Sequence, residues 1–511
     1  MSFVLTENRL RSVNESCRGP LMLMFISAAA WLVISAAFAC LASIRFHSAG
    51  FLADVSWLTY GRVHAASTNA LIYGFAIQAG LGVAAWLICR IGQARLAGTT
   101  VVTVGAGFWN LGVTLGLMGI LCGGSTGFEG FEMPGQVNLM LLAAYISIAG
   151  FALVSFHHRR NREELYPSLW FIVAALFWFP WIFTTANTLL IGAPVRGTMQ
   201  AVVAWWYANN LSAVFFSFIG VGALLYFIPK VSGRALFSRS YLLLAFWVTA
   251  IVAPFGGIPA DAPVPAWMPS MSTVAAVLML VPVIAIAMTV HSTLGQEKCV
   301  TGWGDSSLKF FLFGALAFVF GGLLNAVGPT LEVVNHVFPP LYNGSPAAEV
   351  PGLGGQIEAP PFSQDNFVQF TLLTPALAQL ALYGFLGMTL FGAIYHIVPQ
   401  LMGDELPSAA WKELHWKASL AGIALTVVPL VLGGIYQGGQ WNESLRDFAS
   451  TTALPINMLR AGILGHLALL LGATAFLANL KLIYWRKCCP CCVPSFLRVA
   501  GGEDKTAEAS S

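Results

Sequence analysis

Long apolar stretches separated by short polar segments make up most of this chain of 511 residues. A helix that crosses a bilayer needs about 20 apolar residues. Twelve stretches of that kind fall near residues 21–44, 65–89, 101–121, 138–156, 168–191, 202–228, 241–256, 271–294, 308–328, 368–401, 416–437 and 459–485. The pattern therefore predicts an all-α membrane protein, a bundle of twelve transmembrane helices.

The distribution of positive charge tests this count independently. If the N-terminus is cytoplasmic, 20 of the 25 Lys and Arg residues fall in segments on the inner side and 5 on the outer side. Segments that face the cytoplasm carry such an excess of Lys and Arg in membrane proteins. The bias favours twelve helices with both termini in the cytoplasm, because one helix more or fewer would scramble it.

The helices and their flanking segments divide the chain into three regions. We predict a cytoplasmic N-terminal tail over residues 1–18, a membrane domain over 19–487, and a Cys-rich, disordered cytoplasmic tail over 488–511. The membrane domain includes an outer loop over 329–367, which is long for a structureless connection, so we expect it to pack over the outer face. Four of the nine cysteines fall within Cys488–Cys492, where a juxtamembrane position favours a structural or reversible-acylation role over a metal site.

Composition narrows the possible functions further. Charged residues are 9% of the chain, against about 25% in soluble domains, and the net charge of +3 is too small to indicate a nucleic-acid partner. No acidic residue falls in the middle of a predicted helix, where proton relays and coupling-ion sites normally place one. Interior polar residues such as Asn69 and Gln379 are expected to hydrogen-bond between helices. Of the nine histidines, only His64 and His466 are expected to be partly buried.

Four stretches resemble a known family. Leu58–Phe75 reads LTYGRVHAASTNALIYGF, Trp205–Asn210 reads WWYANN, Phe391–Pro399 reads FGAIYHIVP, and the segment Gly127–Met133 reads GFEGFEM. Together they resemble subunit I of the haem–copper oxidases, most closely the C-type (cbb-type) cytochrome c oxidases. In that family the last stretch is a glutamate-bearing outer loop, so Glu129 and Glu132 are candidate outer-loop residues.

The resemblance also locates the positions that hold metal in the family. The two ligands of its low-spin haem would fall at Ser67 and Gln379, and the ligand of its high-spin haem at Leu377. Its three copper ligands would fall at Asn209, Phe255 and Gly256, and the tyrosine bonded to a copper ligand at Thr249. We therefore expect no haem and no metal, since no ligand residue of the family is present. His64, three residues before Ser67, is the nearest imidazole.

This pattern leads to a main hypothesis and two alternatives. The main hypothesis is a homologue of oxidase subunit I without haem or copper, a structural or partner-binding subunit of a respiratory complex in a bacterial-type inner membrane. Membrane-anchored cytochromes are its expected partners, and aromatic residues including Phe255, or a lipid or quinone-like molecule, would fill the vacated core. The first alternative is an active cytochrome c oxidase or nitric-oxide-reductase-like enzyme that binds haem b and copper through unusual ligands. The second is a channel or transporter for a small solute or lipid on the same scaffold.

Overall fold

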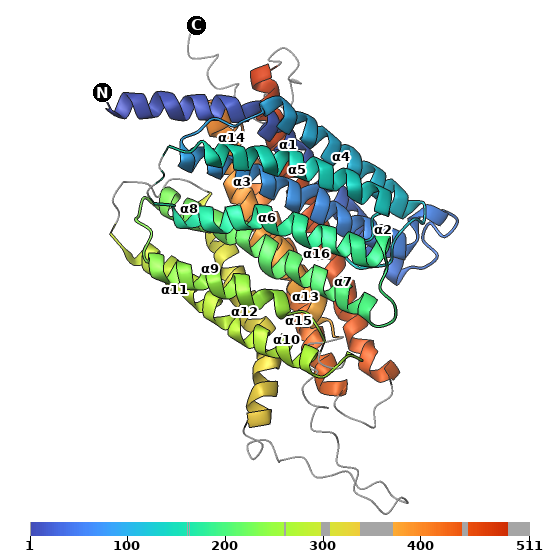
Figure 1. The fold of residues 1–511 in the computed structure, drawn as a ribbon. Helices are drawn as coiled ribbons and strands as arrows, with labels where there is room; N and C mark the ends of the chain where they lie inside the picture. Colours follow the sequence, from blue (N-terminus) through green and yellow to red (C-terminus); the bar gives the residue numbers. More distant parts are fainter. Residues whose placement is uncertain are drawn as a thin grey trace, which may run out of the picture.

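The computed structural model describes residues 2–160, 162, 164–259, 262–297, 307–337, 371–441 and 448–488. Within these ranges, 11 helical segments are long and apolar enough to cross a membrane, and Arg239–Phe255 forms a shorter apolar helix. They lie side by side as one bundle (Figure 1). The prediction of an all-α bundle with twelve spans is confirmed, and the chain is a multi-pass membrane protein.

Some spans are single helices and others are built of consecutive helical pieces. The single helices are α1 (Ser2–His47), α4 (Thr99–Leu121), α5 (Gly135–His157), α12 (Leu308–Val337), α15 (Ala409–Trp441) and α16 (Phe448–Cys488). The composite spans are α2 (Tyr60–Asn69), η2 (Ala70–Ile77) and α3 (Gln78–Gly92); α6 (Pro167–Asn187) and η3 (Thr188–Gly192); α7 (Met199–Asn209), η4 (Asn210–Phe216) and α8 (Ser217–Ser232); α9 (Arg239–Val252) and η5 (Ala253–Phe255); α10 (Trp267–Leu278) and α11 (Leu280–Gly295); and α13 (Leu373–Gln379), η7 (Leu380–Gly387) and α14 (Met388–Met402). A short 3-10 turn, η1 (Ser56–Leu58), precedes α2.

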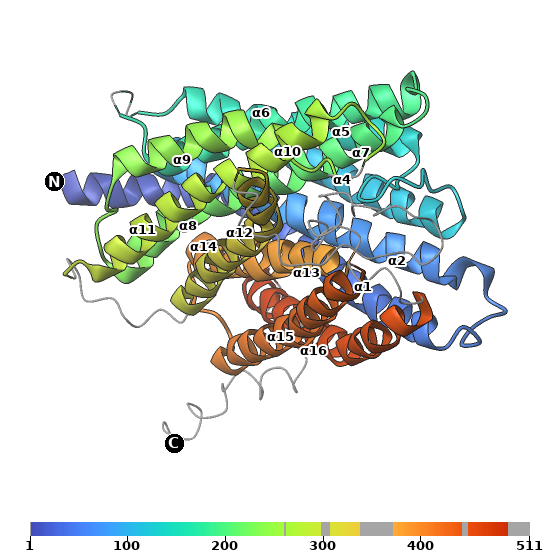
Figure 2. The same cartoon turned by 90° about the horizontal axis from the view of Figure 1, so that it is seen from below.

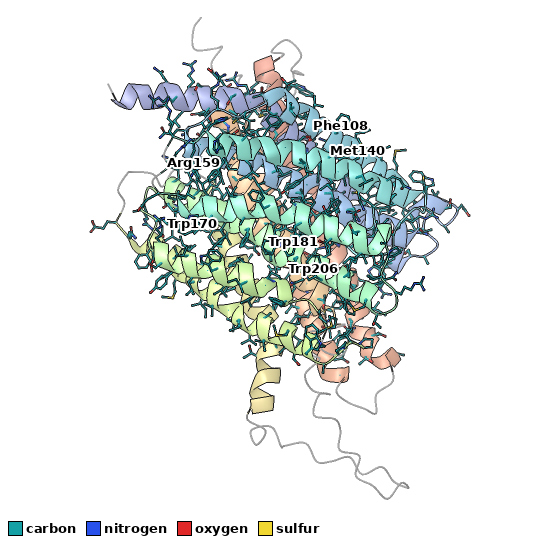
Figure 3. The ribbon with its side chains drawn as sticks, in the orientation of Figure 1. Phe108, Met140, Arg159, Trp170, Trp181 and Trp206 are labelled. Atoms are coloured by element: carbon teal, nitrogen blue, oxygen red, sulfur yellow. The ribbon has the colours of Figure 1, made fainter. Side chains whose placement is uncertain are left out.

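Three composite spans form the centre of the bundle. The most apolar window of Tyr60–Gly92 is 100% buried, and those of Met199–Ser232 and Leu373–Met402 are 78% and 72% buried, whereas the other long spans reach at most 50%. The outer spans expose large apolar side chains such as Phe108 and Trp181, as a lipid-facing surface requires (Figure 3). On one side, α15 and α16 pack along each other (Figure 2).

Glycines let α1 lie directly against the central span. A Cβ atom on Gly74 would lie 2.6 Å from the Trp31 side chain, and one on Gly82 would lie 2.6 Å from the Phe25 ring. A larger residue at either position would push the two helices apart. Large rings from α1 therefore fill the space beside the η2 and α3 backbone, and this packing contributes dispersion energy over many atoms.

Helices continue past two of the predicted boundaries. The segment 1–18 was expected to be a tail, but α1 begins at Ser2, and Val13 and Cys17 are buried. The outer loop was expected to begin at residue 329, but α12 continues to Val337. Hydropathy marks where a chain leaves the bilayer, and a helix can continue past that point because its backbone bonds are internal. The rest of the loop and the cysteines after Cys488 lie outside the described residues.

Candidate functional site

The segment between α4 and α5 enters the bundle at the end opposite the N-terminus, which we call the far end. Its backbone closes on itself: the Thr126 amide donates to the Glu132 carbonyl (3.1 Å), and the Thr126 hydroxyl donates to the Phe131 carbonyl (2.7 Å). The closure turns Phe131, Glu132 and Met133 inward, and all three are buried. A predicted outer-loop residue, Glu132, is thus brought into the core, whereas Glu129 stays exposed.

The buried carboxyl group of Glu132 has one side-chain partner. The Asn69 amide of α2 donates to Glu132 Oε2 (2.6 Å) and to the Ala65 carbonyl (2.8 Å). Glu132 is 8% exposed and Asn69 0%. Burial raises the pKa of Glu132 to about 7, although the hydrogen bond from Asn69 lowers it. The carboxyl group therefore exchanges its proton near neutral pH, which an exposed glutamate does not do.

Two buried tyrosines extend this site toward the next central span. The hydroxyls of Tyr73 and Tyr207 lie 2.8 Å apart, and Tyr73 also donates to the Gly130 carbonyl (3.0 Å). The Trp109 indole of α4 donates to the Tyr73 carbonyl (2.9 Å). We call Asn69, Tyr73, Glu132 and Tyr207 the Glu132 cluster. It joins the far-end loop to two central spans and can hold a proton at Glu132.

Ser67, which the resemblance aligns with a haem ligand, joins two helices. Its hydroxyl donates to the Ser35 carbonyl of α1 (2.9 Å), and the Ser35 hydroxyl donates back to the Ser67 carbonyl (2.9 Å). Both side chains are buried, at 7% and 1% exposure. A reciprocal pair of this kind satisfies the polar groups that small residues bring to a membrane helix interface.

Within the described ranges, the two α13 positions that the resemblance aligns with haem ligands are not joined to a neighbouring helix in the way that Ser67 is. Leu377 and Gln379 are both partly buried. Gln379 Oε1 is enclosed and has no hydrogen-bond partner in the part of the chain that the structure describes. The predicted interhelical bond of Gln379 is therefore not seen for this oxygen.

Two of the three positions assigned to copper lie together. The Asn209 amide donates to the Ala253 carbonyl (2.8 Å), and a Cβ atom on Gly256 would lie 3.2 Å from Asn209 Oδ1. The next residue, Gly257, has φ +89° and would meet Asn209 Cβ at 2.4 Å if it carried a side chain. Phe255 is 53% exposed, so the expectation that it fills the core is wrong. The break after η5 turns its ring outward.

His64 lies at the edge of the bundle. Its ring is exposed and stacks on Tyr60 at 5.4 Å. Glu129 and His466 both lie within electrostatic range of His64. The expected partial burial is confirmed for His466 and is wrong for His64, which faces outward.

One buried histidine was not expected. His415 of α15 is 0% exposed, its Nδ1 lies 3.0 Å from the Tyr395 hydroxyl, and its Nε2 has no partner in the described chain. The Phe391 ring packs on it at 4.5 Å. Helical spacing could have found it, because His415 lies four residues before the buried Ser419 and eight before the buried Ile423.

Each central span widens into a π-helix just after a position that the resemblance aligns with a metal ligand. Segment η2 begins three residues after Ser67, η4 directly after Asn209, and η7 directly after Gln379. Such widened turns are rare in proteins and are frequent at functional sites. Hydropathy and residue type did not predict these widened turns.

These positions do not fit the groups that the family binds. Haem iron takes an axial His, Met, Cys or Tyr, and copper favours imidazole or thiolate. None of these side chains occurs at Ser67, Leu377, Gln379, Asn209, Phe255 or Gly256. The polar groups of Ser67 and Asn209 are bonded to neighbouring backbone. We therefore derive no chemistry through haem or copper.

Known proteins resemble this chain over most of its length. It is 21% identical to the cbb3-type cytochrome c oxidase subunit CcoN1 of Stutzerimonas stutzeri, over 84% of this chain and 85% of that protein. It is 22% identical to cytochrome c oxidase subunit 1 of Rhodobacter capsulatus, over 83% and 77% of the two chains. It is 23% identical to a cytochrome c oxidase subunit 1 homolog of Agrobacterium tumefaciens, over 83% and 76%.

A structural match and a family profile agree with these sequence relatives. A cryo-EM structure of a heme-copper terminal oxidase dimer matches with a TM-score of 0.63 at 14% identity, covering 91% of this chain and 84% of that one. At this identity the match shows the fold alone. The family profile described as Cytochrome C and Quinol oxidase polypeptide I matches residues 20–337 and 350–464. The chain is therefore a divergent member of the haem–copper oxidase subunit I family.

Proposed function

We propose that this protein is a subunit of a respiratory membrane complex that works without haem or copper and has a structural or partner-binding role. The observation that carries the proposal is the use of the former ligand positions. Ser67 joins α2 to α1, and Asn209 joins α7 to the break after η5. Side chains that are committed to helix contacts stabilise the bundle, and neither is an imidazole or a thiolate that haem iron or copper would take.

Packing between two central spans supports the same proposal. A Cβ atom on Gly220 of α8 would lie 2.4 Å from the tip of the Phe385 ring of η7. Phe385 is 4% exposed and also packs on Phe318 at 4.9 Å. Aromatic side chains from the central spans thus occupy space between the helices that carry Asn209 and Gln379, which reduces the need for a cofactor to fill it.

Co-purification tests the partner-binding role. The full-length protein, tagged and expressed from its own locus, is extracted in mild detergent and its partners are identified by mass spectrometry. We expect membrane-anchored cytochromes in stoichiometric amounts. Isolation of the protein alone, with a bound small solute or lipid, would contradict this role and favour a channel or transporter.

Family membership keeps one enzymatic alternative open, because the relatives are cytochrome c oxidase subunits by name. An active oxidase would need replacement ligands for haem b and copper. His64 and His466 are the imidazoles to test, since they lie within electrostatic range of each other on α2 and α16. Haem absorbance that disappears in the H64A/H466A variant would support this alternative.

A further inference from the structure

A cavity of about 390 Å³ lies at the end of the bundle that holds the N-terminus. It forms where α3 ends, where the segment after α5 turns back, and where α6 and α9 begin. Arg159 and Arg239 line it together with one carboxylate, Glu164, and with apolar residues that include Ile91 and Leu169. Figure 3 shows Arg159 and Trp170 at this end of the bundle. The Glu132 cluster lies at the far end, so the cavity is a separate site.

Arg159 brings a guanidinium group to the wall of this cavity. Its Nη1 donates to the Phe156 carbonyl (3.2 Å), and its guanidinium lies 4.2 Å from the centre of the Phe156 ring. Its Nε is enclosed and has no partner among the described residues. An enclosed donor of a charged group without an acceptor is costly. Because Nε is enclosed, an oxyanion in the cavity would meet the terminal nitrogens of the Arg159 guanidinium instead.

Arg239 provides a second positive group, which pairs with Glu164 and can also contact a bound anion. It pairs with Glu164 (2.7 Å) and lies over the Trp170 ring (5.1 Å). The side chains of Arg239 and Glu164 are 49% and 77% exposed, and an exposed ion pair contributes little stability. Arg239 can therefore contact a bound anion without losing a strong bond.

Helix ends and apolar side chains define the kind of anion. The helices α6 and α9 begin at the cavity with Pro167 and Arg239, and the N-termini of helices favour negative charge. Ile91, Leu165 and Leu169 supply apolar surface beside the arginines. Arginine binds phosphate oxygens through two parallel donors. The combination suits a phosphate that is attached to an apolar body.

We propose that this cavity binds a phosphate oxyanion, carried by the headgroup of an anionic phospholipid or present as free phosphate. Arg159 and Arg239 contact the phosphate oxygens, and the apolar wall packs against the attached glycerol and acyl segments when the phosphate belongs to a lipid. This site is independent of the proposed function, since it involves neither the former ligand positions nor the Glu132 cluster.

Native mass spectrometry of the detergent-purified full-length protein tests the site. The probes are phosphatidylglycerol, phosphatidylcholine and inorganic phosphate, each titrated separately. The R159Q/R239Q variant removes both cavity arginines. The matched control R160Q/R162Q removes the same charge from two exposed arginines of the same segment. A third variant, R159K, keeps the charge but lacks the planar guanidinium with its parallel donors.

We expect the wild type to bind phosphatidylglycerol in preference to phosphatidylcholine. The R159Q/R239Q variant should bind phosphatidylglycerol at least about tenfold more weakly, because it lacks both positive groups. A factor of ten in affinity corresponds to about 1.4 kcal/mol. R159K should lose about threefold and R160Q/R162Q less than about twofold on the same scale. Arginine-dependent binding of inorganic phosphate without lipid binding would support the site and identify free phosphate as its ligand. Equal losses in R159Q/R239Q and R160Q/R162Q, or wild-type binding by R159K, would overturn the proposal.

Discussion

At the scale of single residues, Glu132 is the side chain whose environment departs most from its position in the sequence. A glutamate in a loop is expected in water, but here the loop closes through Thr126 and carries the carboxyl group under the protein surface. Asn69 then donates a side-chain hydrogen bond to its carboxylate. The pairing depends on a loop and a helix that are 63 positions apart.

Replacing Glu132 should change the pH dependence of stability. Its pKa is about 7 in the folded protein and 4.5 in a water-exposed chain, so the folded state binds more protons between these values. The contribution of Glu132 to the free energy of unfolding is fully present below about pH 4.5. It falls as the pH rises to about 7, and the total loss is about 3 kcal/mol. The E132Q variant should lack this loss, measured as melting temperature between pH 4.5 and 8.

The matched control is E129Q, which removes an exposed carboxyl group from the same loop. Its melting curve should keep the wild-type dependence on pH. If E132Q and E129Q behave alike, Glu132 does not titrate as a buried group.

A second residue-scale prediction concerns Ser67. The S67A variant should be destabilised by about 0.6 kcal/mol, the average for hydrogen bonds between membrane helices. S67H should be destabilised far more, because an imidazole cannot fit a 7% exposed site against α1 without overpacking. Thermal unfolding followed by tryptophan fluorescence measures both. A stable S67H variant that acquires haem would show that the pocket persists.

The sequence located these positions but not their contacts. The motif around residues 58–75 aligned Ser67 with a haem ligand without a gap, yet nothing local announced Ser35 as its partner. Asn69 was expected to bond between helices and instead reaches a loop. Burial of His415 was missed, because its place beside charged residues indicated a helix end, while the tertiary packing of Phe391 and Tyr395 encloses it.

At the scale of the helices, the spans themselves were predictable from length and hydropathy alone. A run of about 20 apolar residues has few stable alternatives in a bilayer, so twelve runs gave twelve spans. Their internal breaks were not predictable. The π-segments η2, η4 and η7 shift backbone register by one residue, and no residue type signals that shift.

Contact between η7 and α8 gives a prediction at this scale. The G220A variant places a methyl group 2.4 Å from the Phe385 ring, so the ring must move and stability should fall by about 1–3 kcal/mol. The control G150A adds a methyl group where no atom lies within 4 Å, and it should be neutral or stabilising because Ala favours helix over Gly. Melting temperatures compare the two.

A second variant, F385L combined with G220A, tests whether the loss of stability in G220A comes from the Phe385 ring. A smaller side chain at 385 should recover part of the stability lost in G220A. If G220A and G150A have the same melting temperature, the space between η7 and α8 is not filled by Phe385.

At the scale of the whole molecule, the fold of an oxidase subunit is present, and the positions that the resemblance aligns with metal ligands carry other residues. The three most buried spans are the ones that carry Ser67, Asn209 and Gln379. Helix contacts and aromatic rings stabilise this centre in our account. The predicted orientation, with both termini cytoplasmic, rests on the charge bias alone and stays a prediction.

The haem and copper content of the purified protein tests this account most directly. The full-length chain is isolated from haem- and copper-sufficient membranes, and its absorbance spectrum is recorded beside its iron and copper content per chain. The account predicts no Soret band of its own and background levels of both metals. One haem per chain that stays with the purified subunit would contradict it.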